Sequence, residues 1–274
     1  MGEQRVIEQF AEAPVTVESL AADLHMLGVR PGMTLLVHTA LSALGWVCGG
    51  PVAVLLALEQ ALGPAGTLVM PTFSTGLSEP SKWGNPPVPP SWWDTIRQTM
   101  PAYDPVLTPT RKMGAVAECF RSQPGTLRSP HPQLSFAARG PQAERIVGQH
   151  ALDEPLGDNS PLARIYELDG WVLLLGVGHG NNTSLHLAEC RASYPGKHSV
   201  QQGAPMLVNG QRAWVGFAMT GPHDADFPDI GADFATATGQ ERIGPAGAGL
   251  ARLMPQRALV DYGVGWLPAH RRAE

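Results

Sequence analysis

A histidine and a glutamate stand three positions apart where a hydrophobic run gives way to glycines. The segment LLLGVGHGNNTSLHLAEC, residues 173–190, contains them as His186 and Glu189. If Asn182 or Thr183 caps a helix, His186 lies in its first turn with Glu189 on the same face. The helix dipole disfavours imidazolium and the carboxylate favours it, a balance that suits a general base. A partly buried histidine hydrogen-bonded to a helical neighbour is the alternative interpretation.

The glycines of the same segment invite comparison with a dinucleotide-binding fingerprint. Gly176, Gly178 and Gly180 have the spacing G-x-G-x-G rather than G-x-G-x-x-G. No acidic residue closes a following strand at the distance that a ribose contact needs. The sequence therefore argues against a Rossmann cofactor site.

Two further chemistries are weaker options. A zinc site would have to recruit His38, His131 and His179 from distant positions, because the chain has no H-E-x-x-H motif and no closely spaced cysteine pair. Cys48 lies in a glycine-rich stretch, but no neighbour evidently lowers its pKa toward a reactive thiolate. We therefore expect neither a metal nor a cysteine nucleophile.

The segment LLVHTALSALG could bind a ligand through its main chain. Small and hydroxyl residues, among them Thr39, Ala40 and Ser42, follow a predicted strand. Such a turn leaves backbone N–H groups free to bind phosphate or a pantetheine arm. An ordinary strand–helix turn would have the same composition.

These residues must be positioned by alternating helices and strands. Thr16 is expected to cap a helix that Gly28 ends, and Pro51 to open a second helix, VAVLLALEQAL, that Gly63 ends. The apolar runs TLLVH, GTLVMPTF and WVLLLGV read as buried strands. This pattern predicts an α/β fold with a largely parallel central sheet flanked by helices.

The predicted sheet gives the candidate residues a common location. Ligands collect beyond the carboxyl ends of the strands in parallel sheets. His38, Thr72 and the segment 173–190 each follow a predicted strand, so we expect them at one edge.

The remainder of the chain is less regular. Residues 74–112 form a long segment rich in proline and tryptophan, with a short helix expected over SWWDTIRQTM, and serve either as a binding loop or as a packed surface excursion. MGAVAECFRS, GPQAERIVGQH and SPLARIYEL look helical. PMLVNGQRAWVGF predicts a hairpin with Asn209 and Gly210 at its tip, in a C-terminal region.

Composition narrows the class of protein. Hydrophobic residues make up 43% of 274 residues, as in a folded globular chain, and the longest apolar runs are too short to span a bilayer. A net charge of −5 without a basic tract disfavours nucleic acid as a partner. Three widely spaced cysteines, and a first segment, MGEQRVIEQFAEAPV, without the layout of a secretory signal, favour the cytoplasm.

Several segments together resemble the aminoglycoside 3-N-acetyltransferase family, which has the antibiotic N-acetyltransferase fold and differs from the GNAT acetyltransferases. The resemblance covers most of residues 16 to 190. It rests on LLVHTALSALGWVCGGP, LGPAGTLVMPTFS, RSPHPQLSFAARGPQA, NSPLARIYELDGWVLLLGVG and NNTSLHLAE, which occur in the family's order.

The resemblance implies acetyl-CoA as donor and transfer to the 3-amino group of the 2-deoxystreptamine ring, with His186 as general base and Glu189 as its support. Thr72 would reach the acetyl carbonyl. The implied CoA-binding residues are His38, Thr39, Ala40, Leu41, Ser42, Leu44, Thr72, Arg128, Ser129, His131 and Phe136.

Acceptor binding requires acidic residues, because an aminoglycoside is a polycation. Our candidates are Glu79, Asp158, Asp224 and Asp226. The chain departs from the family at residues 219–221, a region that is usually more acidic. Another amine-bearing metabolite therefore remains an alternative acceptor, and a non-catalytic binder of a cationic ligand is a third interpretation.

We expect residues 1–274 to form a single domain. Within it, residues 1–200 would form the CoA-binding and catalytic core, and residues 201–274 would form a region on the acceptor side. We expect a monomer or homodimer that binds no membrane.

Overall fold

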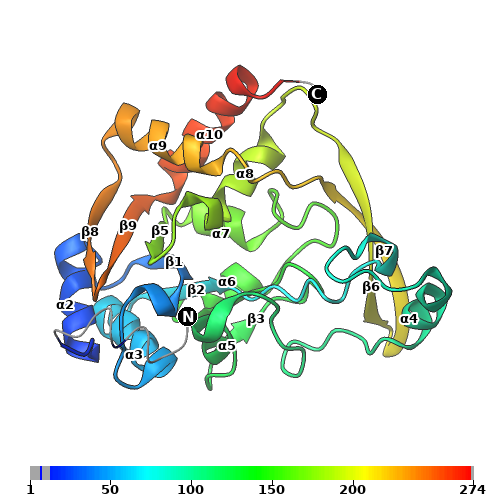
Figure 1. Ribbon diagram of the computed structural model, residues 1–274, viewed down its shortest axis with the longest axis horizontal. Helices are drawn as coiled ribbons and strands as arrows, with labels where there is room; N and C mark the ends of the chain where they lie inside the picture. The colour runs from blue at the N-terminus through cyan, green and yellow to red at the C-terminus, as the bar shows by residue number, and fades with distance from the viewer. Residues whose placement is uncertain (1–6, 8–12, 273–274) are drawn as a thin grey trace.

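The computed structural model describes residue 7 and residues 13–272, so the prediction about a secretory signal lies largely outside the described residues. Its centre is a seven-stranded sheet of order β3-β4-β2-β1-β5-β9-β8 (Figure 1). The strands are β1 (Thr34–Thr39), β2 (Thr67–Pro71), β3 (Leu127–Arg128), β4 (Phe136–Arg139), β5 (Trp171–Leu175), β8 (Arg242–Ala246) and β9 (Gly249–Pro255).

Only the middle of this sheet is parallel. β1 pairs in parallel with β2 and β5, so that Leu36 lies opposite Val69 and Val172. On the outer sides, β4 pairs antiparallel with β2 and β3, and β9 pairs antiparallel with β5 and β8. The prediction of a largely parallel sheet is therefore wrong. An apolar run shows that a strand is covered on both faces but not its direction, and antiparallel β4 is buried in the same way at residues 136–138.

Helices cover both faces of the sheet and form two cores. Leu35 of β1 and Leu173 of β5 pack with α2, α3 and α5, whereas Leu36 and Leu174 pack with α6 to α10. Alternate residues of one strand thus enter opposite cores, as the two-residue period of a strand requires. The helices are α2 (Val17–Leu27), α3 (Gly50–Leu62), α5 (Gly114–Arg121), α6 (Ala143–Val147), α7 (Pro161–Glu167), α8 (Ser184–Arg191), α9 (Phe227–Thr238) and α10 (Gln256–His270).

The predicted ends of the first helix are confirmed. The Thr16 hydroxyl accepts the N–H of Ser19 at 3.1 Å, and Gly28 takes the left-handed conformation, with φ 112°. The helix predicted after Pro51 is α3, and those predicted within residues 113–168 are α5, α6 and α7. Local sequence signals therefore locate these elements well.

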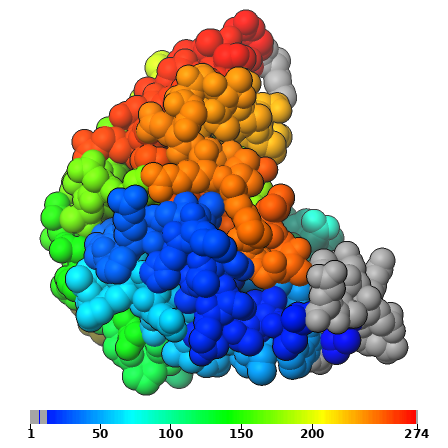
Figure 2. Space-filling model, turned by 90° about the vertical axis from the view of Figure 1, so that its left-hand side faces the viewer, coloured from blue at the N-terminus to red at the C-terminus, as the bar shows by residue number. Residues whose placement is uncertain are grey.

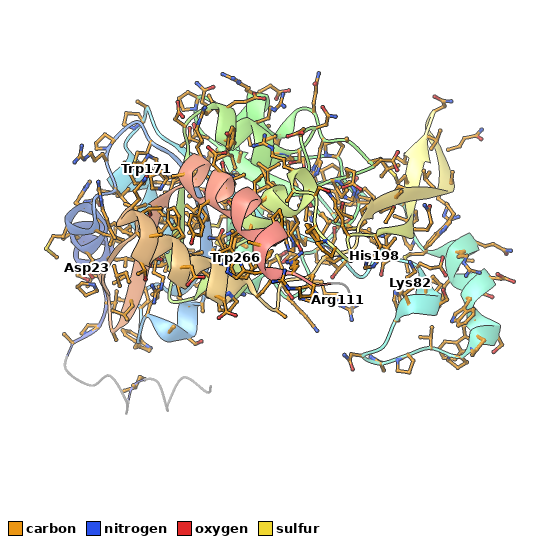
Figure 3. The ribbon with its side chains drawn as sticks, turned by 90° about the horizontal axis from the view of Figure 1, so that it is seen from above. Asp23, Lys82, Arg111, Trp171, His198 and Trp266 are labelled. Carbon is orange, nitrogen blue, oxygen red and sulfur yellow. The ribbon has the colours of Figure 1, made fainter. Side chains whose placement is uncertain are left out.

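The predicted hairpin is confirmed and carries the long proline-rich segment. β6 (Ser199–Val208) and β7 (Gln211–Thr220) form a separate two-stranded sheet on the right of Figure 1, and Asn209 and Gly210 at its tip both have positive φ. The segment contains η2 (Pro80–Lys82), η3 (Pro90–Trp92) and the expected short helix, α4 (Trp93–Thr99). Tyr103 donates its N–H to Pro205 at 2.9 Å. Lys82 contacts the carbonyl of Gln201, on the hairpin side of Figure 3.

The C-terminal elements belong to the main body. α2 lies beside β8 on the face shown in Figure 2, and Asp23 of α2 accepts the N–H of Gly247 at 2.8 Å. Trp266 of α10, labelled in Figure 3, donates to Asp233 of α9 at 2.8 Å. No helix among the described residues is both long and apolar enough to cross a membrane.

Candidate active site

The carboxyl ends of β1, β2 and β5 meet at one edge of the sheet, as their parallel pairing requires. A cavity of about 910 Å³ opens there. Its walls come from residues 37–42 at the end of β1 and just after it, Pro71 and Phe73 at the end of β2, Val177 and residues 180–183 after β5, and residues 112–115 at the start of α5. The three parallel strands thus produce the predicted meeting point, although the outer strands run the other way.

His186 projects from the first turn of α8 into this cavity. The side-chain oxygen of Asn182 accepts the N–H of Ser184 at 3.2 Å, which stabilises the helix start. The ring of Phe227 packs on the imidazole with centroids 4.8 Å apart. The side chain of His186 is 15% exposed and borders the cavity.

Glu189 holds the inner nitrogen of the same imidazole. Its Oε2 contacts Nδ1 of His186, and its side chain is 2% exposed. An ionised carboxylate only accepts hydrogen bonds, so Nδ1 carries the proton and Nε2 keeps its lone pair. The arrangement can therefore accept a proton at Nε2.

Arg271 completes the surroundings of Glu189, and our sequence analysis missed it. Its Nη1 donates to Oε1 of Glu189 at 2.6 Å. Burial alone would lower the pKa of Arg271, but hydrogen bonds to Asp226 and Glu189 outweigh this effect. The net result is a raised pKa, and the guanidinium stays charged. No local sequence signal connects position 271 with position 189.

His38 lies at the end of β1 and borders the cavity with His186. It is 7% exposed, and its Nε2 has no hydrogen-bond partner among the described residues. Burial, followed by the nearby His186, lowers the pKa of His38 to about 3. This imidazole therefore stays neutral near pH 7.

The turn after β1 offers main-chain donors, as the sequence suggested. Ala40 donates its N–H to Leu175 at 3.0 Å, and Ala43 donates to Ala40 at 3.0 Å. Among the described hydrogen bonds, the N–H groups of Leu41 and Ser42 have no acceptor, and both residues border the cavity. Thr39 borders it too, whereas Leu44 is fully buried in the core beside α2 and α3.

Arg128 and Thr72, also predicted to bind CoA, belong to a partly buried hydrogen-bond network next to the cavity residues Pro71 and Phe73. Arg128 donates to the carbonyls of Thr72 and Thr108, both at 2.6 Å, and the Thr72 hydroxyl donates to the Ser135 carbonyl at 3.2 Å. Thr72 is fully buried between the wall residues Pro71 and Phe73. Its predicted contact with the acetyl carbonyl stays a prediction.

The remaining predicted CoA residues are also buried. The Ser129 hydroxyl accepts the N–H of Phe136 at 2.9 Å and contacts Nδ1 of His150 at 2.9 Å. His131 accepts the N–H of Leu134 at 2.9 Å through Nδ1. Phe136 is fully buried in the core. These side chains hold the β3–β4 region together, and their roles toward CoA stay predictions.

The four predicted acceptor carboxylates lie in different places. Asp224 borders the cavity. Asp226, Asp158 and Glu79 are paired with Arg271, Arg191 and Arg97 respectively, at 2.8, 2.8 and 2.5 Å.

Two of these pairings shift the acidity of the carboxyl group. Hydrogen bonds from Arg97 hold the pKa of Glu79 below its usual value, against the effect of burial. Burial alone would raise the pKa of Asp226, but Arg271 outweighs it and lowers that pKa. Both carboxyl groups are therefore ionised at neutral pH.

The cysteine and histidine residues of the two alternative chemistries lie in separate places. Cys48 is exposed and is not among the residues bordering the cavity, and burial raises the pKa of Cys190 to about 12. Within the described part of the chain, no three His, Cys, Asp or Glu side chains are grouped to hold a metal ion. His179 pairs with Glu241 at 2.8 Å and is not among the residues that border the cavity.

The sequence model of a family described as aminoglycoside 3-N-acetyltransferase matches residues 36–268. The chain is 43% identical, over 92% of each sequence, to the SPbeta prophage-derived aminoglycoside N(3')-acetyltransferase-like protein YokD of Bacillus subtilis (strain 168). It is 38% identical to aminoglycoside N(3)-acetyltransferase VII of Streptomyces paromomycinus, over 94% of this chain and 93% of the relative.

Solved structures agree with these similarities. The fold matches the crystal structure of YokD with a TM-score of 0.94, at 41% identity over 97% of this chain and 98% of that one. It matches AAC-IIIb in a binary complex with CoASH at 0.83 (34% identity, 93% and 97% coverage). It matches AAC-VIa bound to sisomicin at 0.85 (32% identity, 95% and 100% coverage).

Proposed function

The chain belongs to the aminoglycoside 3-N-acetyltransferase family, and from this premise we propose that it transfers the acetyl group of acetyl-CoA to the 3-amino group of the 2-deoxystreptamine ring of an aminoglycoside. One observation carries the proposal. His186 borders a cavity large enough for a cofactor-sized ligand, and a buried carboxylate fixes its Nδ1 proton.

The chemistry requires a base at this point. An aminoglycoside amine is largely protonated in water, and it cannot attack an acyl group until it loses a proton. His186 takes this proton at Nε2, while Glu189 accepts the hydrogen bond from Nδ1–H and stabilises the resulting imidazolium. The free amine nitrogen then bonds to the acetyl carbon, the carbon–sulfur bond breaks, and the second proton of the nitrogen passes to the departing CoA thiolate. Transfer is therefore direct and needs no enzyme nucleophile.

The cavity fits the donor by its chemistry. Acetyl-CoA supplies an acetyl group activated as a thioester. The N–H groups of Leu41 and Ser42, which have no acceptor in the described part of the chain, are donors for its carbonyl or phosphate oxygens, and Lys112 places a cation at the wall. Apolar wall residues, among them Trp46 and Phe73, suit the pantetheine arm. The CoASH complex of the related AAC-IIIb supports this assignment.

The acceptor has a second candidate, which is another amine-bearing metabolite. The sisomicin complex of AAC-VIa and the position of Asp224 support an aminoglycoside. The name of YokD describes it only as acetyltransferase-like, and residues 219–221 carry no acidic side chain. These two observations favour testing simple amines beside the antibiotics.

The experiment is a thiol-release assay with acetyl-CoA and gentamicin, apramycin or a panel of simple amines, followed by NMR of the product to identify the acetylated nitrogen. We expect turnover with at least one aminoglycoside and acetylation at its 3-amino group. Turnover with simple amines alone would favour the metabolite enzyme. Antibiotic binding measured by calorimetry without any acetylation would favour the non-catalytic binder.

A further inference from the structure

The guanidinium of Arg271 links the base to the end of the last helix. Beyond its bond to Glu189, its Nε and Nη2 each donate to a different oxygen of Asp226 at 2.8 Å, and Nη2 also donates to the carbonyl of His223 at 2.6 Å. Its side chain is 9% exposed and lies over the ring of Tyr194, 4.7 Å from the centroid. Arg271 is thus a fixed part of the interior.

The hydrogen bond from Arg271 to Glu189 removes the rotational freedom of the Glu189 carboxylate. Oε2 contacts His186, and Oε1 accepts from Arg271 and, at 3.3 Å, from the N–H of His223. The carboxylate cannot turn without breaking a charge-assisted bond on one side. A buried carboxylate also requires a compensating charge, which the guanidinium supplies.

We propose that Arg271 is a positioning residue for the acetyl transfer, an inference that rests on the function proposed above. Arg271 holds Glu189 in the orientation that keeps Nε2 of His186 toward the cavity, and Asp226 anchors Arg271. The charges agree with this role. Glu189, Asp226 and Arg271 together carry one negative charge, so proton uptake by His186 brings the group to neutrality.

The protein contains a second histidine–glutamate–arginine series that serves as an internal control. His179 contacts Oε1 of Glu241 at 2.8 Å, and Arg252 donates to Oε2 of Glu241 at 2.9 Å. Glu241 is as buried as Glu189, but neither His179 nor Arg252 borders the cavity. Substitution of Arg252 therefore measures the effect of breaking a buried arginine–glutamate pair that has no contact with His186.

The experiment compares Arg271→Ala, Arg271→Lys and Arg252→Ala in the full chain. For Arg271→Ala we expect kcat to fall about 10²-fold, as for a base displaced by about 1 Å, while the dissociation constant of CoA changes less than about twofold. Arg271→Lys keeps the positive charge but cannot donate to two carboxylates at once as the guanidinium does. Its kcat should therefore lie between those of wild type and Arg271→Ala. Added guanidinium should restore part of the activity of Arg271→Ala. Arg252→Ala should lower the melting temperature and leave kcat near the wild-type value.

Two results would overturn the proposal. One is a kcat for Arg271→Ala within about twofold of wild type, and the other is an equal loss of kcat in Arg252→Ala. If Arg271→Ala does not fold, Asp226→Asn loosens the anchor and should lower kcat. A rise in the acceptor KM alone would instead assign Asp226 to substrate binding and reject the anchor.

A separate readout distinguishes this inference from the proposed function. If wild-type protein acetylates no amine, the function fails, but the Nδ1–H signal of His186 in histidine-labelled NMR spectra still reports its bond to Glu189. That signal should be present in wild type and in Arg252→Ala and should shift or disappear in Arg271→Ala. An unchanged signal would reject the positioning role whatever the activity.

Discussion

Gly263 of α10 lies directly against Ala188 of α8, so that a Cβ on the glycine would be 2.9 Å from the Cβ of the alanine. Real Cβ pairs essentially never come so close, and the glycine therefore sets the distance between the two helices. Glu189 follows Ala188, and Arg271 follows the end of α10. The spacing of the helices and the Glu189–Arg271 pair consequently depend on each other.

The first prediction changes this spacing. Gly263→Ala should lower the free energy of unfolding by about 1–3 kcal/mol, because the added methyl forces α10 away from α8. It should also lower kcat, because Arg271 moves away from Glu189. Gly265→Ala is the matched control in the same helix. That position has open space around it, so the substitution should be neutral or stabilise by about 0.5–1 kcal/mol. Urea unfolding and steady-state kinetics of both variants check this, and equal behaviour would contradict it.

Part of the site could be predicted because its residues are close in sequence. The spacing of His186 and Glu189 alone predicts that they face the same side of a helix. The small and hydroxyl residues at 39–42 predict a turn. Arg271 could not be predicted in this way, because its contact depends on how α10 packs on α8. His179 belongs to the same segment as His186 and yet is not among the residues that border the cavity, which the sequence alone does not reveal.

The same limit applies to the fold, because local signals predict single elements but not how distant elements pair. Capping residues and apolar runs locate α2, α3, β1, β2 and β5, because these signals act within a few residues. Strand direction and the partners at the sheet edges depend on contacts between distant segments. β8 and β9 were therefore not foreseen, and neither was the antiparallel pairing of β4.

The second prediction concerns the base itself. His186→Ala should remove most turnover while CoA affinity stays nearly intact, because the imidazole is proposed to move a proton, whereas the N–H groups of Leu41 and Ser42 stay in place for CoA. A decrease in kcat of about 10²–10⁴-fold is expected. Stopped-flow or steady-state assays, with CoA binding measured by calorimetry, provide the check. Unchanged turnover would remove the general-base assignment.

The third prediction separates the acidic candidates. Asp224→Asn should raise the acceptor KM about tenfold or more, because this carboxylate borders the cavity and has no arginine partner among the described ion pairs. Asp169→Asn is the control, since Asp169 pairs with Arg257 on the exposed surface. Its KM should equal that of wild type. An unchanged KM for Asp224→Asn would place the acceptor elsewhere.

The fourth prediction is a loss of stability in mild acid. Burial lowers the pKa of His38 and His131 to about 3 and that of His150 to about 4, with a smaller contribution to His38 from His186 and to His131 from His150. In the unfolded chain these histidines titrate near 6.5, so below this pH the unfolded state binds more protons than the folded state. The free energy of unfolding therefore falls as the pH falls.

The size of this effect follows from the linkage relation. Between pH 7.5 and 5.5 each of these histidines should cost about 1 kcal/mol, because the unfolded chain takes up protons that the buried imidazoles do not. Carboxyl groups with lowered pKa values, such as Glu118 at about 2, stop stabilising the folded state only at a pH lower than this range. Urea unfolding at both pH values measures the difference. His150→Gln should remove about a third of it, because glutamine has no proton to gain. A free energy of unfolding that is equal or higher at pH 5.5 would mean that these imidazoles are not held neutral by burial.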